Sequence, residues 1–245
     1  MPFTVRAITL DLDDTLWPIL PAIERAESAL DAWLGAQSPA IAARWTRAER
    51  NRLRLQVDRD RPHLAHDMTA QRQFMLERLL AESGLDAARA DDAFEAYFAA
   101  RCEVEHYPDT LAALERLAAR VPLASISNGN ACLRRIGLMP LFRFQLGARE
   151  HGAAKPAASI FHTACRELGC APHEVLHVGD DIEADVMGAA RAGLRTCWIE
   201  RLDGSTMAGR RDWPHADLRP DLHFHDLAAL ADWLDAHIDT ETAAA

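Results

Sequence analysis

Two aspartates near the N-terminus, Asp11 and Asp13, are the residues with the clearest chemical potential. Val5, Ile8 and Leu10 precede them in an apolar run of strand length. In open parallel α/β sheets, ligands bind beyond the carboxyl ends of the strands, so both carboxylates are expected at such an end. Because two carboxylates so close together repel each other, the pair predicts a cation beside it.

A calcium loop also begins with Asp-x-Asp, and it requires Asp or Asn at its fifth position and Gly at its sixth. This sequence has Thr15 and Leu16 at those positions, after a strand rather than a helix, which disfavours a calcium loop. From this stretch alone, a plain acidic turn after a strand stays an alternative.

Two further apolar runs end in residues that could bind an anion. Ser127 offers a hydroxyl, and the amides that follow it, beginning with Asn128, could form an anion-binding nest. Lys155 is the only lysine among 27 basic residues and stands before Pro156, which is typical of a helix start. The alternatives are an ordinary capped turn for the first stretch and biased composition for the second.

A third apolar run, 175–179, ends in a cluster of acids formed by Asp180, Asp181 and Asp185. Acidic residues often stand at helix starts simply as partners of the helix dipole. Together, however, these strand ends supply carboxylates, a hydroxyl with free amides and one lysine. Magnesium-assisted phosphoryl transfer requires these groups, because the metal binds carboxylates and the phosphoryl group needs donors and positive charge.

The elements that must position these residues alternate between strand and helix from residue 109 onward, which predicts a parallel sheet covered on both faces. We expect an α/β fold, namely a Rossmann-like doubly wound parallel sheet with an inserted α-helical domain. Strands are expected at 5–10, 121–127, 143–146, 174–179, 194–199 and 222–224, and helices at 109–119, 131–138, 156–169, 182–192 and 225–237.

Between the first strand and this alternating region, the apolar spacing is helical for about ninety residues. Helices are expected at 20–36, 40–58, 67–82 and 87–103, with breaks at Gly35, Pro39, Pro62 and Gly84. The predicted domains are therefore a core of 1–17 and 106–245 and a helical insertion of 18–105. The loop at 201–220 is expected to be a functional flap or a mobile segment, and the tail 240–245 to be frayed.

The composition restricts the possible partners. A net charge of −10 disfavours nucleic acid and anionic membranes, and no apolar run approaches the length of a membrane span. The N-terminus lacks the pattern of a signal peptide, and the five scattered cysteines include no CxxC pair. We therefore expect a cytoplasmic protein with reduced thiols, without a disulfide framework or a zinc site.

The ordered motifs DxDxT, SNG, KP and GDDxxxxD resemble those of the haloacid-dehalogenase (HAD) superfamily of aspartate-dependent phosphatases, over residues 5 to about 200. The insertion resembles the C1 cap of that superfamily. The stretches DLDDTLW, ISNGN and LHVGDD and the segment 63–69 are similar to the bacterial flavin-pathway phosphatases. Those enzymes act on FMN or on 5-amino-6-(5-phosphoribitylamino)uracil, which is a precursor in riboflavin biosynthesis.

The resemblance implies a role for each carboxylate that matches a motif. Asp11 would be the nucleophile that forms an aspartyl-phosphate. Asp13 would protonate the leaving oxygen and then activate the hydrolytic water. Mg²⁺ would be held by Asp11, the backbone carbonyl of Asp13, and Asp180.

The same resemblance assigns the remaining motif residues. Ser127 and the amide of Asn128 would bind phosphate oxygens, and Lys155 would neutralise developing charge. Asp181 or Asp185 would orient Lys155 or a water, and the motif does not separate the two. In the cap, residues expected to face the leaving group are Trp17, His63, His66, Arg72 and Phe74.

The resemblance further implies a small phosphorylated metabolite as partner and a monomer or homodimer. Phosphoglycolate, a sugar phosphate and a nucleoside monophosphate are alternative substrates, and a phosphomutase shares every core residue. The dehalogenase branch of the superfamily works without metal and lacks the second aspartate, so Asp13 argues against that branch.

Two non-enzymatic classes use part of the same residue set. Receiver modules of signalling proteins also use an acidic pair, a phosphorylated Asp, a Ser or Thr and a Lys. In those modules the acidic pair opens the chain and the acceptor Asp lies on a middle strand. Here the pair follows the first strand and a second acidic cluster comes last, so the order disagrees. The inserted helices also suit an enzyme that excludes water during turnover. An inactive scaffold would have lost a core residue, and none is missing.

Overall fold

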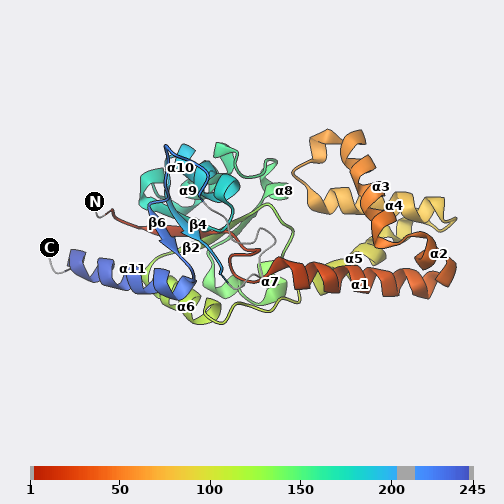
Figure 1. Cartoon of the computed structure of the whole chain (residues 1–245), viewed down its shortest axis with the longest axis horizontal. Helices are drawn as coiled ribbons and strands as arrows, with labels where there is room; N and C mark the ends of the chain where they lie inside the picture. Colours follow the sequence, from red (N-terminus) through yellow and green to blue (C-terminus); the bar gives the residue numbers. More distant parts are fainter. Residues whose placement is uncertain (1–2, 203–212, 243–245) are drawn as a thin grey trace.

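The computed structural model describes residues 3–202 and 213–242, and its centre is a parallel sheet of six strands in the order β3-β2-β1-β4-β5-β6 (Figure 1). This arrangement confirms the predicted Rossmann-like α/β fold. The strands are β1 (Ala7–Leu10), β2 (Leu123–Ser127), β3 (Gln145–Gly147), β4 (Val175–Gly179), β5 (Arg195–Ile199) and β6 (Leu222–Phe224).

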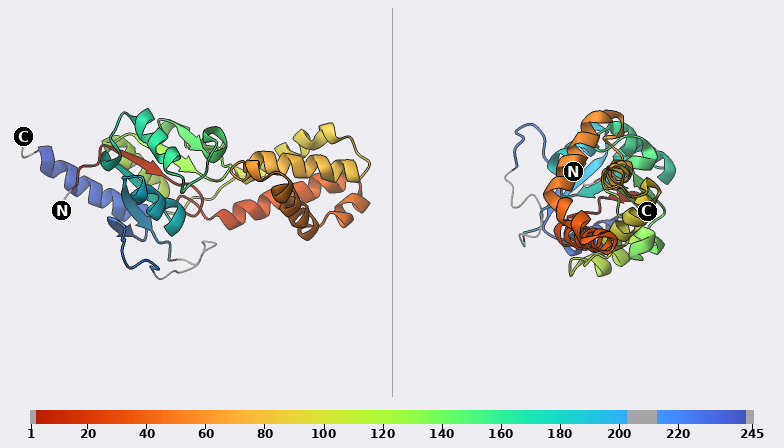
Figure 2. Two further views of the ribbon diagram at one scale, coloured as in Figure 1. Left: turned by 90° about the horizontal axis from the view of Figure 1, so that it is seen from above. Right: turned by 90° about the vertical axis from the view of Figure 1, so that its right-hand side faces the viewer.

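Helices cover both faces of the sheet because its strands are apolar on both sides (Figure 2). In β1, Ile8 and Leu10 pack with the buried side chains of α6 and α11, whereas Ala7 packs with those of α9 and α10. The core helices are α6 (Thr110–Arg120), α7 (Leu133–Ile136), α8 (Ala148–His151), α9 (Ala158–Leu168), α10 (Gly188–Arg191) and α11 (Leu227–Thr242).

The insertion forms a separate helical lobe, the cap, which extends from one end of the sheet and has its own apolar core (Figure 1). Its α-helices are α1 (Ile19–Gln37), α2 (Pro39–Arg44), α3 (Arg47–Asp60), α4 (Met68–Glu82) and α5 (Ala90–Arg101). The helix expected at 40–58 is thus two helices. The break occurs at Trp45, because the Thr46 side chain accepts the Glu49 N–H and begins a new helix.

Three other elements differ from the expectation. The helix expected at 131–138 is reduced to α7, which ends at Gly137 with a φ of 90°. The helix expected at 182–192 begins as a π-helical turn, Ile182–Met187, and continues as α10. α11 runs to Thr242, beyond the expected end at 237.

Two expectations concern segments that are only partly described. Residues 203–212 of the expected flap and residues 243–245 of the expected tail lie outside the described residues. Within the part of the chain that is described, no helix has both the length and the apolar character needed to cross a bilayer.

A buried ion network holds the cap helices together. Arg50 is only 2% exposed. Its guanidinium donates to Glu27 at 2.8 Å, to Asp31 at 2.6 Å and to the carbonyl of Trp45 at 2.7 Å. On the same helix, Arg52 is exposed and pairs with Glu49, one turn away.

We predict that Arg50→Ala lowers the free energy of unfolding by about 3–5 kcal/mol, because Glu27 is left as a buried charge without one of its partners. Urea unfolding followed by circular dichroism measures this loss. The matched control Arg52→Ala, on the exposed face of α3, should change stability by about 0.5 kcal/mol or less. Equal losses for the two variants would contradict the assignment.

Candidate active site

The polar residues that follow β1, β2 and β4 meet at one edge of the sheet because these strands are neighbours in the order β2-β1-β4. They line a single cavity of about 360 Å³. All eight core residues expected from the sequence belong to its lining: Asp11, Asp13, Ser127, Asn128, Lys155, Asp180, Asp181 and Asp185.

Lys155 is the central cation of this cavity, and its residue is only 5% exposed. Its Nζ donates to Asp11 at 2.5 Å and to Asp185 at 2.6 Å. The ring Nε2 of His177 lies 3.0 Å from the same Asp185 oxygen, and its Nδ1 lies 2.9 Å from the hydroxyl of Thr9. His177 and Thr9 were not expected at the site, and they complete a buried chain of polar contacts behind the lysine.

Burial strongly shifts the pKa values of the carboxyl groups in this cluster. It raises the pKa of Asp11 to about 7, against the opposing effect of Lys155 and with the help of nearby Asp185 and Asp13. It also raises the pKa of Asp180, and the charges of Asp11 and Asp185 add to that rise. In Asp185 burial acts in the same direction, but Lys155 and His177 outweigh it and bring the pKa to about 2.

The donor set suits a small divalent cation. Carboxylate oxygens of Asp11, Asp180 and Asp185 lie within 4.8 Å of one another. Both carboxylate oxygens of Asp185 already have protein partners. One contacts Lys155 and His177, and the other accepts the Asp181 N–H at 3.1 Å. Asp11 and Asp180 are therefore the carboxylates available to an ion, which matches the one or two that Mg²⁺ uses in phosphate sites.

Ser127, the last residue of β2, and Asn128, the first residue after it, have different partners. Ser127 is 1% exposed, and its Oγ accepts the Gly129 N–H at 3.0 Å. The Asn128 side chain binds the backbone of Lys155 on both sides: its Oδ1 accepts the Lys155 N–H at 2.7 Å and its Nδ2 donates to the Lys155 carbonyl at 2.9 Å. The sequence analysis assigned a role only to the backbone N–H of Asn128. The contact of its side chain with the Lys155 backbone, which links two loops, was not expected.

The structure separates the two acids that the motif left equivalent. Asp185 contacts the Lys155 ammonium directly. Asp181 instead accepts the N–H groups of Glu183 and Ala184, at 2.9 and 2.8 Å, and so begins the π-helical turn. That turn brings Asp185 back toward the lysine.

Asp13 is held by groups from two parts of the chain. Trp17 donates its Nε1 to Asp13 at 2.9 Å, and the Nη2 of Arg101 lies 2.6 Å from both carboxylate oxygens. The expectation that Trp17 faces the leaving group is wrong, because this residue is fully buried and packs edge-on against His106. Arg101 was missed, since an arginine at a helix end carries no sequence signal of a site.

A second cavity, of about 370 Å³, continues from Asp13 into the cap. We call it the cap cavity. Ile19 and Met68 line both cavities. The polar lining of the cap cavity is Glu27, Arg47, Asn51, Arg54, Gln71, Arg72, Tyr97, Arg101 and Asn130.

The other cap residues expected near the substrate are scattered. Arg72 lines the cap cavity, but its guanidinium is engaged by Glu27 at 3.0 Å and by the Tyr97 ring at 3.7 Å. His66 lines a smaller cavity, of about 170 Å³, beside the cap cavity. His63 is exposed and lines neither, and Phe74 packs against the cap core.

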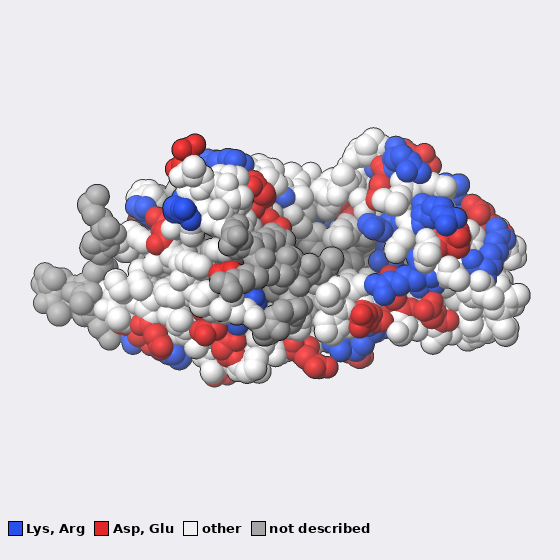
Figure 3. All heavy atoms as spheres, in the orientation of Figure 1, with Lys and Arg blue, Asp and Glu red and all other residues white. Residues whose placement is uncertain are grey.

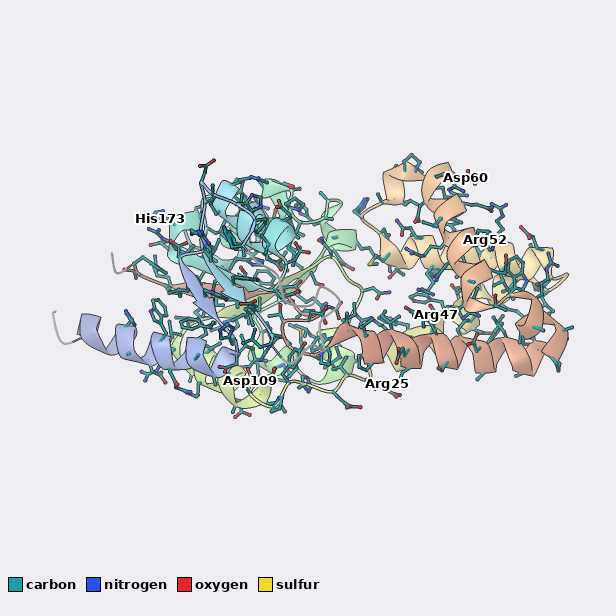
Figure 4. All side chains as sticks on the ribbon, in the orientation of Figure 1. Arg25, Arg47, Arg52, Asp60, Asp109 and His173 are labelled. Atoms are coloured by element: carbon teal, nitrogen blue, oxygen red, sulfur yellow. The ribbon has the colours of Figure 1, made fainter. Side chains whose placement is uncertain are left out.

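Three polar residues of α3 that the sequence analysis did not single out also line the cap cavity. Arg47, Asn51 and Arg54 recur at helical spacing on the stripe that faces the cap cavity, whereas Leu53 and Val57 face the cap core. Figure 4 shows Arg47 at the start of α3, beside α1, with Arg52 and Asp60 further along the helix. The spacing of polar and apolar residues in α3 could have revealed this stripe.

Comparison with known proteins agrees with this geometry. The chain is 34% identical, over 92% of its length and 94% of the other protein, to the 5-amino-6-(5-phospho-D-ribitylamino)uracil phosphatase YigB of Escherichia coli. It is 28% identical to a glyceraldehyde 3-phosphate phosphatase of Methanopyrus kandleri, over 85% of this chain and 89% of that one.

Among solved structures, a 2-haloacid dehalogenase from Pseudomonas syringae superposes with a TM-score of 0.86 at 33% identity, covering 95% of this chain and 99% of the other. The family model described as haloacid dehalogenase-like hydrolase matches residues 5–193. The chain therefore belongs to the haloacid dehalogenase-like hydrolases.

Proposed function

We propose that this chain hydrolyses phosphomonoesters with the help of Mg²⁺, through an aspartyl-phosphate on Asp11. The observation that supports this most directly is the meeting of Asp11, Lys155 and Asp180 in one cavity that also contains Ser127. The phosphatases among its relatives support the same reaction class.

In this proposal, an oxygen of Asp11 attacks phosphorus and the bond to the leaving oxygen breaks. Lys155 and the Ser127 hydroxyl contact the phosphoryl oxygens and stabilise their charge. Asp13 gives its proton to the leaving oxygen, which departs as an alcohol, and the Asp13 carboxylate then takes a proton from the water that hydrolyses the intermediate. Asp11 and Asp180 would hold Mg²⁺, which supplies the positive charge that lets an anionic phosphate approach a carboxylate.

We predict that Asp11→Asn lowers kcat by at least about a thousandfold, because the amide is a far poorer nucleophile than the carboxylate. Phosphate release from p-nitrophenyl phosphate measures this. The variant should melt at or above the wild-type temperature without metal, because it removes a buried charge beside Asp180. Turnover near that of the wild type would sink the proposed reaction.

We also predict that Mg²⁺ raises the melting temperature more at pH 8 than at pH 5. The pKa of Asp11 is raised from 3.8 to about 7, so the folded protein binds this proton more tightly than the unfolded chain. Without metal, stability therefore falls as pH rises between these two values. A cation replaces the proton, so its stabilising effect grows over the same range.

Thermal unfolding with and without Mg²⁺ tests this, with EDTA as the metal-free reference. Asp11→Asn should lose most of the pH dependence of the Mg²⁺ effect. A Mg²⁺ shift of equal size at both pH values would contradict the linkage.

For the substrate, we propose 5-amino-6-(5-phosphoribitylamino)uracil or FMN. Support comes from the 34% identity to a phosphatase of the first compound and from the polar cap cavity. In that cavity Arg47, Asn51 and Arg54 would donate to the oxygens of the leaving group. Figure 3 shows basic side chains gathered on the cap, interleaved with acidic ones, and all of them are arginines because the cap contains no lysine.

We predict that Arg47→Met and Arg54→Met each raise KM for this uracil derivative about tenfold, through the loss of a charge-assisted hydrogen bond. KM for p-nitrophenyl phosphate, which is too short to reach α3, should change less than about twofold. Arg52→Met, on the exposed face of the same helix, is the control. Unchanged KM values for the uracil derivative would remove α3 from the substrate site.

A panel of substrates separates this proposal from its alternatives. It should include phosphoglycolate, a hexose phosphate and a nucleoside monophosphate. It should also contain 2-chloropropionate, because the P. syringae relative is named a dehalogenase. Release of chloride from 2-chloropropionate without release of phosphate from any phosphate ester would overturn the proposed phosphatase activity. Isomerisation of a sugar phosphate would favour a mutase.

A further inference from the structure

Arg101 is the last residue of α5, yet its guanidinium reaches Asp13 in the loop after β1. It is 1% exposed. Its Nη2 lies 2.6 Å from both oxygens of Asp13. Burying a guanidinium is costly unless it is paired, so this contact is unlike the solvated arginine pairs elsewhere on the cap.

The hydrogen bonds of Arg101 differ from those of the other buried arginines. Arg50 joins two acids and a carbonyl within the cap, and Arg201 joins Asp109 to the Thr15 carbonyl. Among the described residues, Arg101 donates to Asp13 alone, and its buried Nη1 has no hydrogen-bond partner. Arg50 and Arg201 also leave one buried donor, Nε, without a partner, but each binds at least two different groups, whereas Arg101 binds a single carboxylate.

The carboxylate of Asp13 is confined on its other sides as well. Trp17 donates to one oxygen at 2.9 Å. A Cβ placed on Gly129 would come within 2.5 Å of the other oxygen and 3.8 Å from the Nη2 of Arg101. The Asp13 side chain therefore occupies a slot formed by Trp17, Arg101 and the backbone of Gly129.

We propose that Arg101 is a positioning residue, which sets the side chain of Asp13 at the leaving oxygen of the substrate. The inference rests on the proposed function, because it assigns Asp13 the proton transfer. Since Trp17 belongs to the core loop and Arg101 to the cap, the slot is complete only when the cap lies against the core. The cap thereby contributes to the chemical step as well as to substrate choice.

Two substrates with different leaving groups test this. The alkoxide that leaves from FMN needs a proton, whereas p-nitrophenolate leaves without one. Arg101→Met should lower kcat/KM for FMN about thirtyfold or more, and kcat/KM for p-nitrophenyl phosphate less than about threefold. The ratio kcat/KM reports only the steps up to release of the alcohol, so the later hydrolysis of the intermediate does not mask the difference.

Arg101→Lys is the second variant, and it keeps a buried positive charge in case the methionine variant unfolds. It should show the same selective loss on FMN in a milder form, because one ammonium cannot reproduce the contact with both oxygens. In an Asp13→Asn background, Arg101→Met should lower kcat/KM for FMN by less than about a further twofold, since both changes remove the same function.

Equal losses of kcat/KM on FMN and p-nitrophenyl phosphate in both Arg101 variants would overturn the proposal. So would a double variant whose loss on FMN equals the product of the two single losses. The proposed function has a separate test. Full activity of Asp11→Asn would sink the phosphatase mechanism, whereas equal losses in the Arg101 variants would remove only the positioning role.

Discussion

The contact between the Lys155 ammonium and the carboxylates of Asp11 and Asp185 is the interaction on which the rest of the site depends. Several carboxylates converge at the ends of the neighbouring strands β1 and β4, where burial disfavours their charged forms. One lysine offsets part of this charge, and His177 and Thr9 hold Asp185 in place behind it. The remaining excess of negative charge makes the cavity suitable for a divalent cation.

This constraint also explains the local backbone around the site. A regular α-helix after β4 would have 3.6 residues in each turn. The π-helical turn at Ile182–Met187 inserts one residue, with the Val186 N–H bound to the Asp181 carbonyl at 3.2 Å. Such turns are frequent at functional sites. Here it allows Asp181 to begin the turn while Asp185 faces the lysine.

The sequence predicted the fold well, and the residues expected at the strand ends do line one cavity, because both depend on local patterns. Apolar runs of strand length that end in Asp11, Ser127 and Asp180 imply convergence at one sheet edge, whatever the loops do. Arg101 could not be predicted in this way, since its partner Asp13 is 88 residues away in the chain. Trp17 was misjudged for a related reason: its indole N–H turns back to the catalytic loop, and aromatic character alone does not give direction.

The cap was predicted less well than the core. Its helical nature followed from spacing, but the division of one expected helix at Trp45 depends on a single capping side chain. Histidine and aromatic types suggested His63 and Phe74 as substrate contacts, whereas the cap cavity takes most of its polar lining from residues of α3, α4 and α5. His63 and Phe74 do not line the cap cavity, whereas three polar residues at helical spacing on α3 do.

The reciprocal pair of hydrogen bonds between the Asn128 side chain and the Lys155 backbone makes two distant loops behave as one unit. An anion that orders the loop after β2 would at the same time order the segment that carries the lysine. The entropic cost of fixing the two loops is then met once rather than twice. A ligand that contacts both loops would therefore order them together rather than in succession.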